Sequence, residues 1–217
     1  MNWKLDYPNK SGERLEAPRS RGGFFGSSGI MVTPGDYTIT LVKRVDGVTT
    51  VLQGPKTFKV IPMYDGTLPR KSYDEMNAFR EEVFSFQQDL TATNLTMSNS
   101  LKYIDAMKRA ANKANNPNND LLQKINGTRI TLLEIEKILS GNKIKGEIGE
   151  RSNPTPNDAN RIGRVVLSNT YGPTGNHKDA FNRAKNQLSG VKQQLQNVTN
   201  NVFPALEDEL KKQELLG

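Results

Sequence analysis

Residues 30–42 of this chain read Ile30-Met31-Val32-Thr33-Pro34-Gly35-Asp36-Tyr37-Thr38-Ile39-Thr40-Leu41-Val42. From residue 37 onward, aromatic and aliphatic side chains alternate with threonines at a period of two. This period, with β-branched and aromatic residues, predicts a strand with one buried face. Asp46-Gly47 follows and favours a hairpin, because both central residues of such a turn take a positive φ.

The partner strand is expected over Val48–Leu52. Gly54-Pro55 is expected to break it, and the alternation resumes over Lys56–Ile61. Upstream, Trp3, Leu5 and Tyr7 alternate with polar residues and predict one more strand, which Pro8 ends. The total is four or five strands, whereas an immunoglobulin-like sandwich needs about seven. We therefore expect that upstream strands are missing from this chain or that another chain supplies them.

The period changes from two to that of a helix after residue 71. Ser72 is a candidate N-cap, and Glu75 would complete a capping box. A long helix to about residue 115 follows from the apolar stripe Met76, Phe79, Val83, Phe86, Leu90, Met97, Leu101, Ile104 and Met107. The polar stretch at Thr91–Asn94 is where we expect a kink.

Further helices are predicted by the same criterion. A second long helix spans Asn119–Ser140, a shorter one Asn157–Tyr171, and a third long one begins near Thr174. Asn142–Pro156 is expected to be a polar loop. Pro204 lacks an N–H and should kink or end the last helix, leaving a short final turn.

The predicted fold class is therefore α+β. A partial immunoglobulin-like antiparallel β-sandwich (residues 1–62) leads through a linker (63–70) into an antiparallel bundle of three long helices and one short helix (71–217).

Composition removes several classes of function. The chain of 217 residues has no cysteine and one histidine, His177, so thiolate chemistry, most metal sites and most catalytic triads are not expected. No cofactor is expected, since no phosphate-binding glycine motif opens a helix. No apolar run approaches the ~18 residues of a membrane span. We expect no enzyme and no membrane span.

The net charge of +7 admits an anionic partner. The basic residues are scattered among 23 acidic ones, and no aromatic residues are interleaved with a basic patch, so nucleic-acid binding is not expected. Binding of an acidic protein through a basic surface of the helices remains an alternative function.

A long polar, glycine-rich loop is predicted between residues 9 and 29. Loops of this length inside a compact domain are often functional. Its candidate protein-contact residues are Arg19, Arg21, Phe24 and Phe25. The two phenylalanines could equally tuck back into their own domain.

Four patterns in chain order carry a resemblance to a known family: Asn2-Trp3-Lys4-Leu5-Asp6-Tyr7-Pro8, the run from Val32 to Leu41, Gly172-Pro173-Thr174 at a helix start, and Val202-Phe203-Pro204-Ala205-Leu206. Together they resemble the C-terminal region of exported bacterial proteins with sortilin-like (VPS10) or BNR-repeat β-propellers, which are often labelled glycosyl hydrolases. In that family an immunoglobulin-like module similar to that of flagellar hook-capping proteins follows the propeller, and a helical bundle ends the chain.

The resemblance implies that the propeller, the first strands of the module and any catalytic residues lie upstream of residue 1. It also implies export to the periplasm, cell surface or surroundings of a bacterium. On this interpretation the chain is a non-catalytic region that braces the propeller or docks a cell-surface protein.

Overall fold

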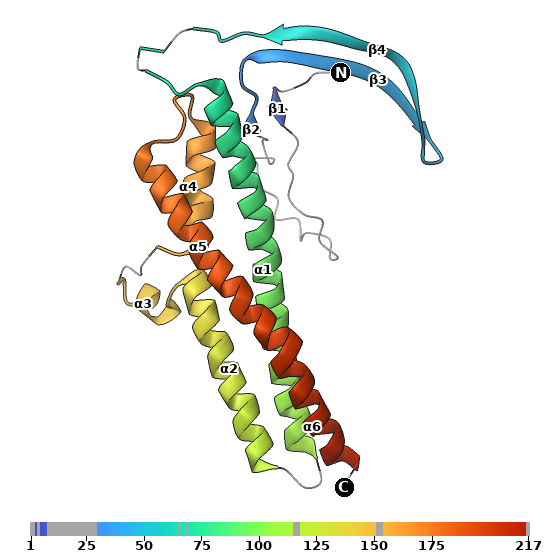
Figure 1. Ribbon diagram of the computed structural model, residues 1–217, viewed down its shortest axis with the longest axis vertical. Coiled ribbons are helices and arrows are strands. Elements are labelled where there is room, and N and C mark those ends of the chain that lie inside the picture. Colours follow the sequence, from blue (N-terminus) through green and yellow to red (C-terminus); the bar gives the residue numbers. More distant parts are fainter. Residues whose placement is uncertain are drawn as a thin grey trace.

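The computed structural model describes residues 3, 5–7, 30–64, 66–67, 69–114, 118–150 and 154–215. A small β part leads into a long helical bundle (Figure 1). In chain order the elements are β1 (Asp6–Tyr7), β2 (Ile30–Met31), β3 (Gly35–Val45), β4 (Val48–Val60), α1 (Tyr73–Lys113), α2 (Asn119–Ser140), α3 (Lys143–Glu147), α4 (Pro156–Ser168), α5 (Gly175–Asn197), the π-helix η1 (Val198–Val202) and α6 (Phe203–Leu215).

The bundle is organised around two long helical columns that run the same way. One column is α1, and the other is the continuous series α5, η1 and α6 (Figure 1). The helices α2 and α4 run in the opposite direction, with α2 beside the half of the bundle far from the strands and α4 beside the near half. The prediction of a helical bundle is confirmed.

The apolar stripes read from the sequence form the core. Its buried members are Phe79, Val83, Phe86, Leu90, Met97, Ile104, Met107, Ala111, Leu121, Ile125, Leu132, Ile135, Leu139, Ala159, Phe181, Ala184, Leu188, Val191, Leu195, Val198, Phe203 and Leu206. The Phe181 ring lies between two rings of α1, at centroid distances of 5.3 Å from Phe79 and 5.0 Å from Phe86. Each fully buried side chain of this kind contributes roughly 1.5–3 kcal/mol.

The helix starts differ from the prediction in one respect. Ser72 caps α1 by accepting a hydrogen bond from the Glu75 N–H, as expected. The Glu75 side chain does not complete a capping box, because its carboxylate pairs with Lys178 of α5 at 2.5 Å. A capping box forms instead at α5, where the Thr174 N–H donates to Nδ1 of His177 and the His177 N–H donates to the Thr174 hydroxyl.

The helices are continuous at both places where the sequence predicts a kink or a break, so the predicted end of the last helix at Pro204 is wrong. α1 continues through Thr91–Asn94, where the hydroxyls of Thr91 and Thr93 donate to the carbonyls of Gln87 and Asp89 within the helix. The last column continues past Pro204 to Leu215, because the chain widens into η1 and the Phe203 N–H bonds to the Val198 carbonyl. The wide turn accommodates a residue that has no N–H.

A third helix correction concerns the predicted loop Asn142–Pro156. Its first part forms the short helix α3, which Asn142 caps by accepting from the Ile144 N–H.

The second strand of the hairpin is longer than predicted. β4 runs through Gly54-Pro55 without a break, because it absorbs extra residues as bulges. The pairing Ile39↔Lys56 is followed by Leu41↔Gln53 and then by Val42↔Val51, so β4 uses one residue more than β3 at each of the two steps.

No immunoglobulin-like sandwich is formed by the described residues. They make two separate two-stranded antiparallel sheets, β1–β2 and β3–β4. The continuity of β4 is one reason, since two expected strands are a single strand.

Candidate interaction surface

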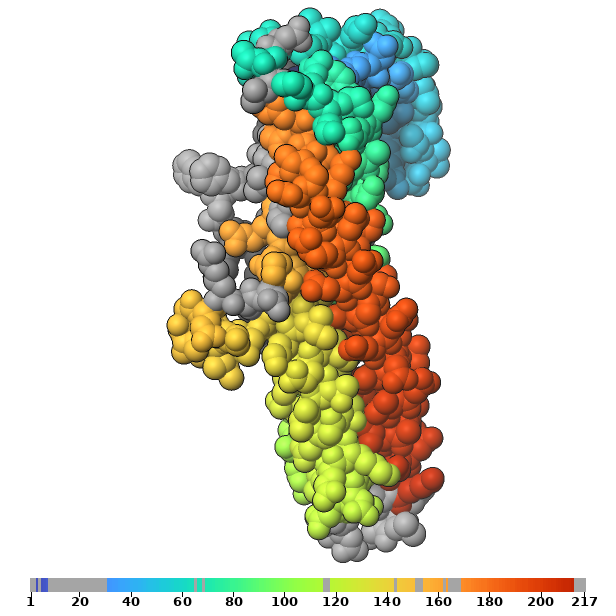
Figure 2. Space-filling model, turned by 60° about the vertical axis from the view of Figure 1, so that its left-hand side comes forward, coloured from blue at the N-terminus to red at the C-terminus, as the bar shows by residue number. Residues whose placement is uncertain are grey.

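The ribbon formed by β3 and β4 stands clear of the bundle (Figure 1; blue and cyan at the top of Figure 2). Most of its residues are exposed on both strands. Its exposed apolar side chains are Ile39, Leu41, Val42, Val45, Val48, Val51, Leu52 and Phe58. Exposed apolar side chains that gather on one element often mark an interaction site.

The apolar side chains gather on one face. Neighbouring residues of a strand point to opposite faces, so the ladder register assigns each residue to a side. The odd face carries Tyr37, Ile39, Leu41, Lys43 and Val45 of β3, with their partners Phe58, Lys56, Gln53, Thr50 and Val48 of β4. Ile39, Leu41 and Val48 are 60%, 57% and 67% exposed. The opposite face is more polar and has Val42 and Val51 as its apolar pair.

An aromatic cluster lies at the base of the odd face. The Trp3 ring lies 5.4 Å from Tyr37 and 5.8 Å from Phe58 between centroids. The Tyr37 and Phe58 rings stack at 6.1 Å. These contacts place Trp3 against the odd face. The base of this face is therefore partly covered by the N-terminal segment.

Arg80 of α1 ties the strands to the bundle. Its side chain is buried, Nη2 donates to the Met31 carbonyl at 3.1 Å, and Nη1 donates to Oδ1 of Asn77 at 2.9 Å. The guanidinium also lies 4.9 Å above the Tyr7 ring. Asn77 accepts a second bond from the Thr33 hydroxyl.

The Tyr37 hydroxyl continues this network at the base of the ribbon. It donates to the Thr33 carbonyl at 2.6 Å and lies 3.3 Å from the Tyr7 hydroxyl. Burial, and next the hydrogen bond with Tyr7, raise the pKa of the Tyr37 phenol above its ordinary value of 10.0. The base of the ribbon is therefore held by several contacts, and among the described residues no comparable contact reaches its far end.

The two outer edges of the ribbon differ. β4 contains Pro55 and both bulges, whereas β3 is regular over its 11 residues and contains no proline. Prolines, bulges and charged side chains are devices by which natural edge strands avoid pairing with further strands; both strands carry lysines, whereas only β4 carries the proline and the bulges.

Charge on the ribbon is uneven. Lys43 and Arg44 lie side by side on β3, and their ladder partners are the uncharged Thr50 and Thr49. None of the ion pairs between described residues includes either cation.

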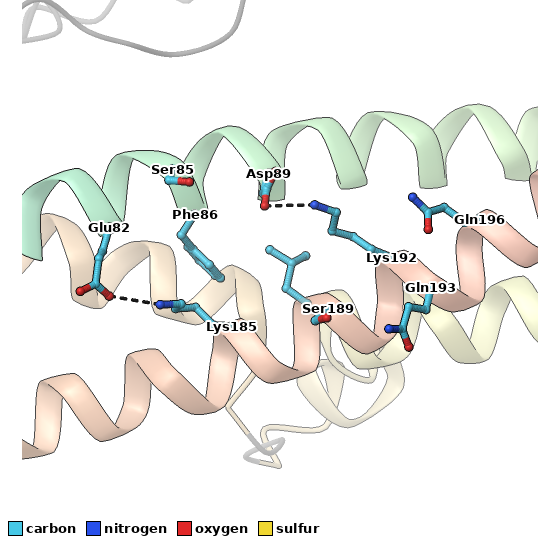
Figure 3. Close-up of a pocket in the computed structure, with 10 residues that line it drawn as sticks. Glu82, Ser85, Phe86, Asp89, Lys185, Ser189, Lys192, Gln193 and Gln196 are labelled. Atoms are coloured by element: carbon cyan, nitrogen blue, oxygen red, sulfur yellow. Dashed lines mark hydrogen bonds and ion pairs between the residues drawn. The ribbon is translucent and has the colours of Figure 1, made fainter.

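The bundle has a shallow groove of about 430 Å³ between α1 and α5 (Figure 3). Phe86 and Leu188 are among its apolar lining residues. Its acidic and basic residues pair with each other, Lys185 with Glu82 at 3.1 Å and Lys192 with Asp89 at 3.0 Å. The groove thus offers neither an uncompensated charge nor a histidine for chemistry.

These two pairs belong to a ladder in heptad steps. Glu75, Glu82 and Asp89 of α1 are seven residues apart, and their partners Lys178, Lys185 and Lys192 of α5 keep the same spacing. Flanking charges of this kind fix the register and orientation of packed helices.

The residues predicted as a contact loop, Arg19, Arg21, Phe24 and Phe25, lie outside the described residues. The residues of the ribbon were not predicted to form an interaction surface. The shortage of strands relative to a sandwich was the sequence signal that pointed to one. His177 lies in the first turn of α5, as expected, and serves as a helix cap.

Two features are absent from the described part of the chain. The described residues contain no group of three or more histidine, cysteine or carboxylate side chains arranged to hold a metal ion. None of their helices combines the length and apolar character that crossing a membrane requires.

Comparison with family models, with curated proteins and with solved structures found no match to this chain.

Proposed function

We propose that this chain is a non-catalytic interaction module whose β3–β4 ribbon is completed by strands of polypeptide outside residues 1–217. The observation that carries the proposal is the exposed odd face. Ile39 and Leu41, and beyond the pair Lys43↔Thr50 also Val45 and Val48, are exposed apolar residues of this face that no described element covers.

The free energy of burying apolar side chains favours a ribbon whose odd face is covered. An isolated two-stranded hairpin is marginal in water, and three or more strands or a packed face are needed for stability. Covering one of these aliphatic side chains fully contributes roughly 1.5–3 kcal/mol. The odd face therefore has the potential to supply much of the free energy of a stable association.

The bundle serves as the brace in this proposal. Its heptad ladder fixes α1 against α5, and Arg80 fixes the strands to α1. The ribbon thereby lies at one end of an elongated support (Figure 2).

Within this function we propose that the chain is the C-terminal region of an exported bacterial propeller protein, and that the ribbon is part of an immunoglobulin-like module. The support is the set of four sequence patterns together with the open ribbon. The coding sequence upstream of Met1 tests this: a propeller followed by two or three strands is expected, and an unrelated domain or no coding sequence there contradicts it.

The interaction itself is tested by comparing residue-resolved amide exchange in residues 1–217 with that in the longer polypeptide. Protection of the ribbon is expected to rise in the longer polypeptide while protection in the bundle stays unchanged. A variant of the longer polypeptide with Ile39→Thr and Leu41→Thr should lose this rise in ribbon protection. It should keep its helical content, since neither side chain is buried in the chain alone. Turnover of glycans or peptides by the purified chain would contradict a non-catalytic role.

Binding of an acidic partner is a second candidate. The bundle lysines at the α1–α5 seam are already paired. The observation in favour of this candidate is the couple Lys43 and Arg44 on the ribbon, which forms no ion pair with the described part of the chain. Binding that collapses as salt is raised would favour this candidate, because exposed charges are screened.

A further inference from the structure

We infer that the strand completing the ribbon adds to the outer edge of β3, not of β4, and carries two neighbouring acidic residues beside Lys43 and Arg44. This inference rests on the proposed function and names the edge and the chemistry of the partner.

The edge of β4 is unsuited to strand addition. Pro55 has no N–H to donate, and the two bulges place an extra residue in β4 at each step, which disturbs the spacing of its outward N–H and C=O groups. Gly54 also has a φ of +116°, and a Cβ there would lie 2.9 Å from the Ile39 carbonyl oxygen. This irregular backbone is therefore fixed by contact with β3.

The edge of β3 is regular over its whole length. The turn residues Asp46 and Gly47 have φ of 50° and 81°, as in a two-residue hairpin of type I′. In such a hairpin the flanking pair Val45↔Val48 exchanges both backbone hydrogen bonds and the next pair exchanges none. By this alternation the amides of Val42 and Arg44 point away from β4, where an added strand would accept from them.

Side chains specify the added strand further. Residues of the new strand beside Tyr37, Ile39 and Leu41 extend the apolar odd face, so they are apolar. Lys43 and Arg44 lie on opposite faces and face threonines across the ladder, so a strand added at the outer edge of β3 is the neighbour placed to pair with them. Two consecutive carboxylates, one on each face, match them.

The probe is a synthetic eleven-residue peptide, the length of β3, in which valine alternates with threonine and two adjacent glutamates stand near its N-terminus for antiparallel addition. One control peptide replaces the glutamates by lysines. A second carries N-methyl groups on alternate amides, which removes backbone donors and keeps the side chains. Binding and amide exchange are measured on the whole chain.

We expect the glutamate peptide to slow exchange at the Val42 and Arg44 amides by at least about tenfold while leaving Thr49 and Val51, the matching outward positions of β4, unchanged. N-methylation should abolish binding. Removing the charge of Lys43 or of Arg44 should weaken binding of the glutamate peptide by up to about fivefold, which is the range of one exposed ion pair. The double variant Lys43→Glu with Arg44→Glu should prefer the lysine peptide. Lys56→Glu on β4 is the matched control and should still prefer the glutamate peptide.

Protection at Thr49 and Val51, equal binding of the N-methylated peptide, or no binding would each overturn the inference. The proposed function fails separately: it requires only that the longer polypeptide protects the ribbon, at whichever edge or face.

Discussion

Nη2 of Arg80 lies 3.1 Å from the carbonyl oxygen of Met31 and joins α1 to β2 across 49 residues of sequence. This bond, with those to Asn77, links β2 and Thr33 to the bundle, and the Tyr37 hydroxyl extends the network to the base of β3.

Arg80→Ala should loosen this link. The Met31 carbonyl and the Asn77 amide would lose a buried donor, which costs about 1–3 kcal/mol. Urea unfolding should show a lower midpoint, and amides near Met31 should exchange faster. The exposed Arg109→Ala is the control and should change stability by no more than about 0.5 kcal/mol. Equal stability of both variants would show that Arg80 is not an anchor.

Gly163 tests the close packing of α4 against α1. A Cβ at this position would lie 2.8 Å from a methyl of Val83, whose side chain is fully buried. Gly163→Ala should therefore destabilise the chain by about 1–3 kcal/mol through overpacking. Gly127→Ala, in the open surface of α2, should instead stabilise by about 0.5–1 kcal/mol. Thermal unfolding of the two variants should give shifts of opposite sign; shifts of the same sign would be inconsistent with the packing described.

Gly54 tests the bulged ribbon. Gly54→Ala combines a φ of +116° with contacts of 2.9 Å to the Ile39 oxygen and 3.0 Å to the Thr40 Cα. The pairing of β3 with β4 should be lost around this position while the helices keep their circular dichroism. Gly47→Asn is the matched control, because no atom lies within 4 Å of its added Cβ and asparagine tolerates positive φ. Retained ribbon chemical shifts in Gly54→Ala would contradict this register.

The charge ladder predicts a dependence on pH. The hydrogen bond from Lys178 lowers the pKa of Glu75 below its ordinary value of 4.5. A carboxyl whose pKa is depressed by folding adds stability above its unfolded pKa and loses it as pH falls through the folded value. Stability measured from about pH 6 down to pH 3 should fall less steeply in Lys178→Met than in the parent chain. An unchanged slope would show that the pair does not contribute.

The helical half was predictable because its signal is local. Stripes such as Phe79, Val83 and Phe86 repeat with the helix period, and their burial follows from that period alone. Ser72 could be recognised as a cap for the same reason, whereas the partner of Glu75 lies 103 residues away on α5 and could not.

The ribbon was predictable only in part. The alternation and Asp46-Gly47 indicate the hairpin, but Gly54-Pro55 reads as a break although β4 bulges and continues. Which apolar residues stay exposed depends on what packs against them, and Ile39 and Leu41 have the same pattern as buried strand residues. The open face therefore had to come from the structure.

The central claim is that the ribbon depends on polypeptide outside residues 1–217, and residue-resolved hydrogen exchange of the chain alone tests it most directly. The ribbon amides that bond across the hairpin, measured at Ile39, Val45 and Val48, should exchange orders of magnitude faster than those of Ile104 and Leu132 in the bundle core. Equal protection of ribbon and core would show that the hairpin is stable without a partner, and would contradict the account.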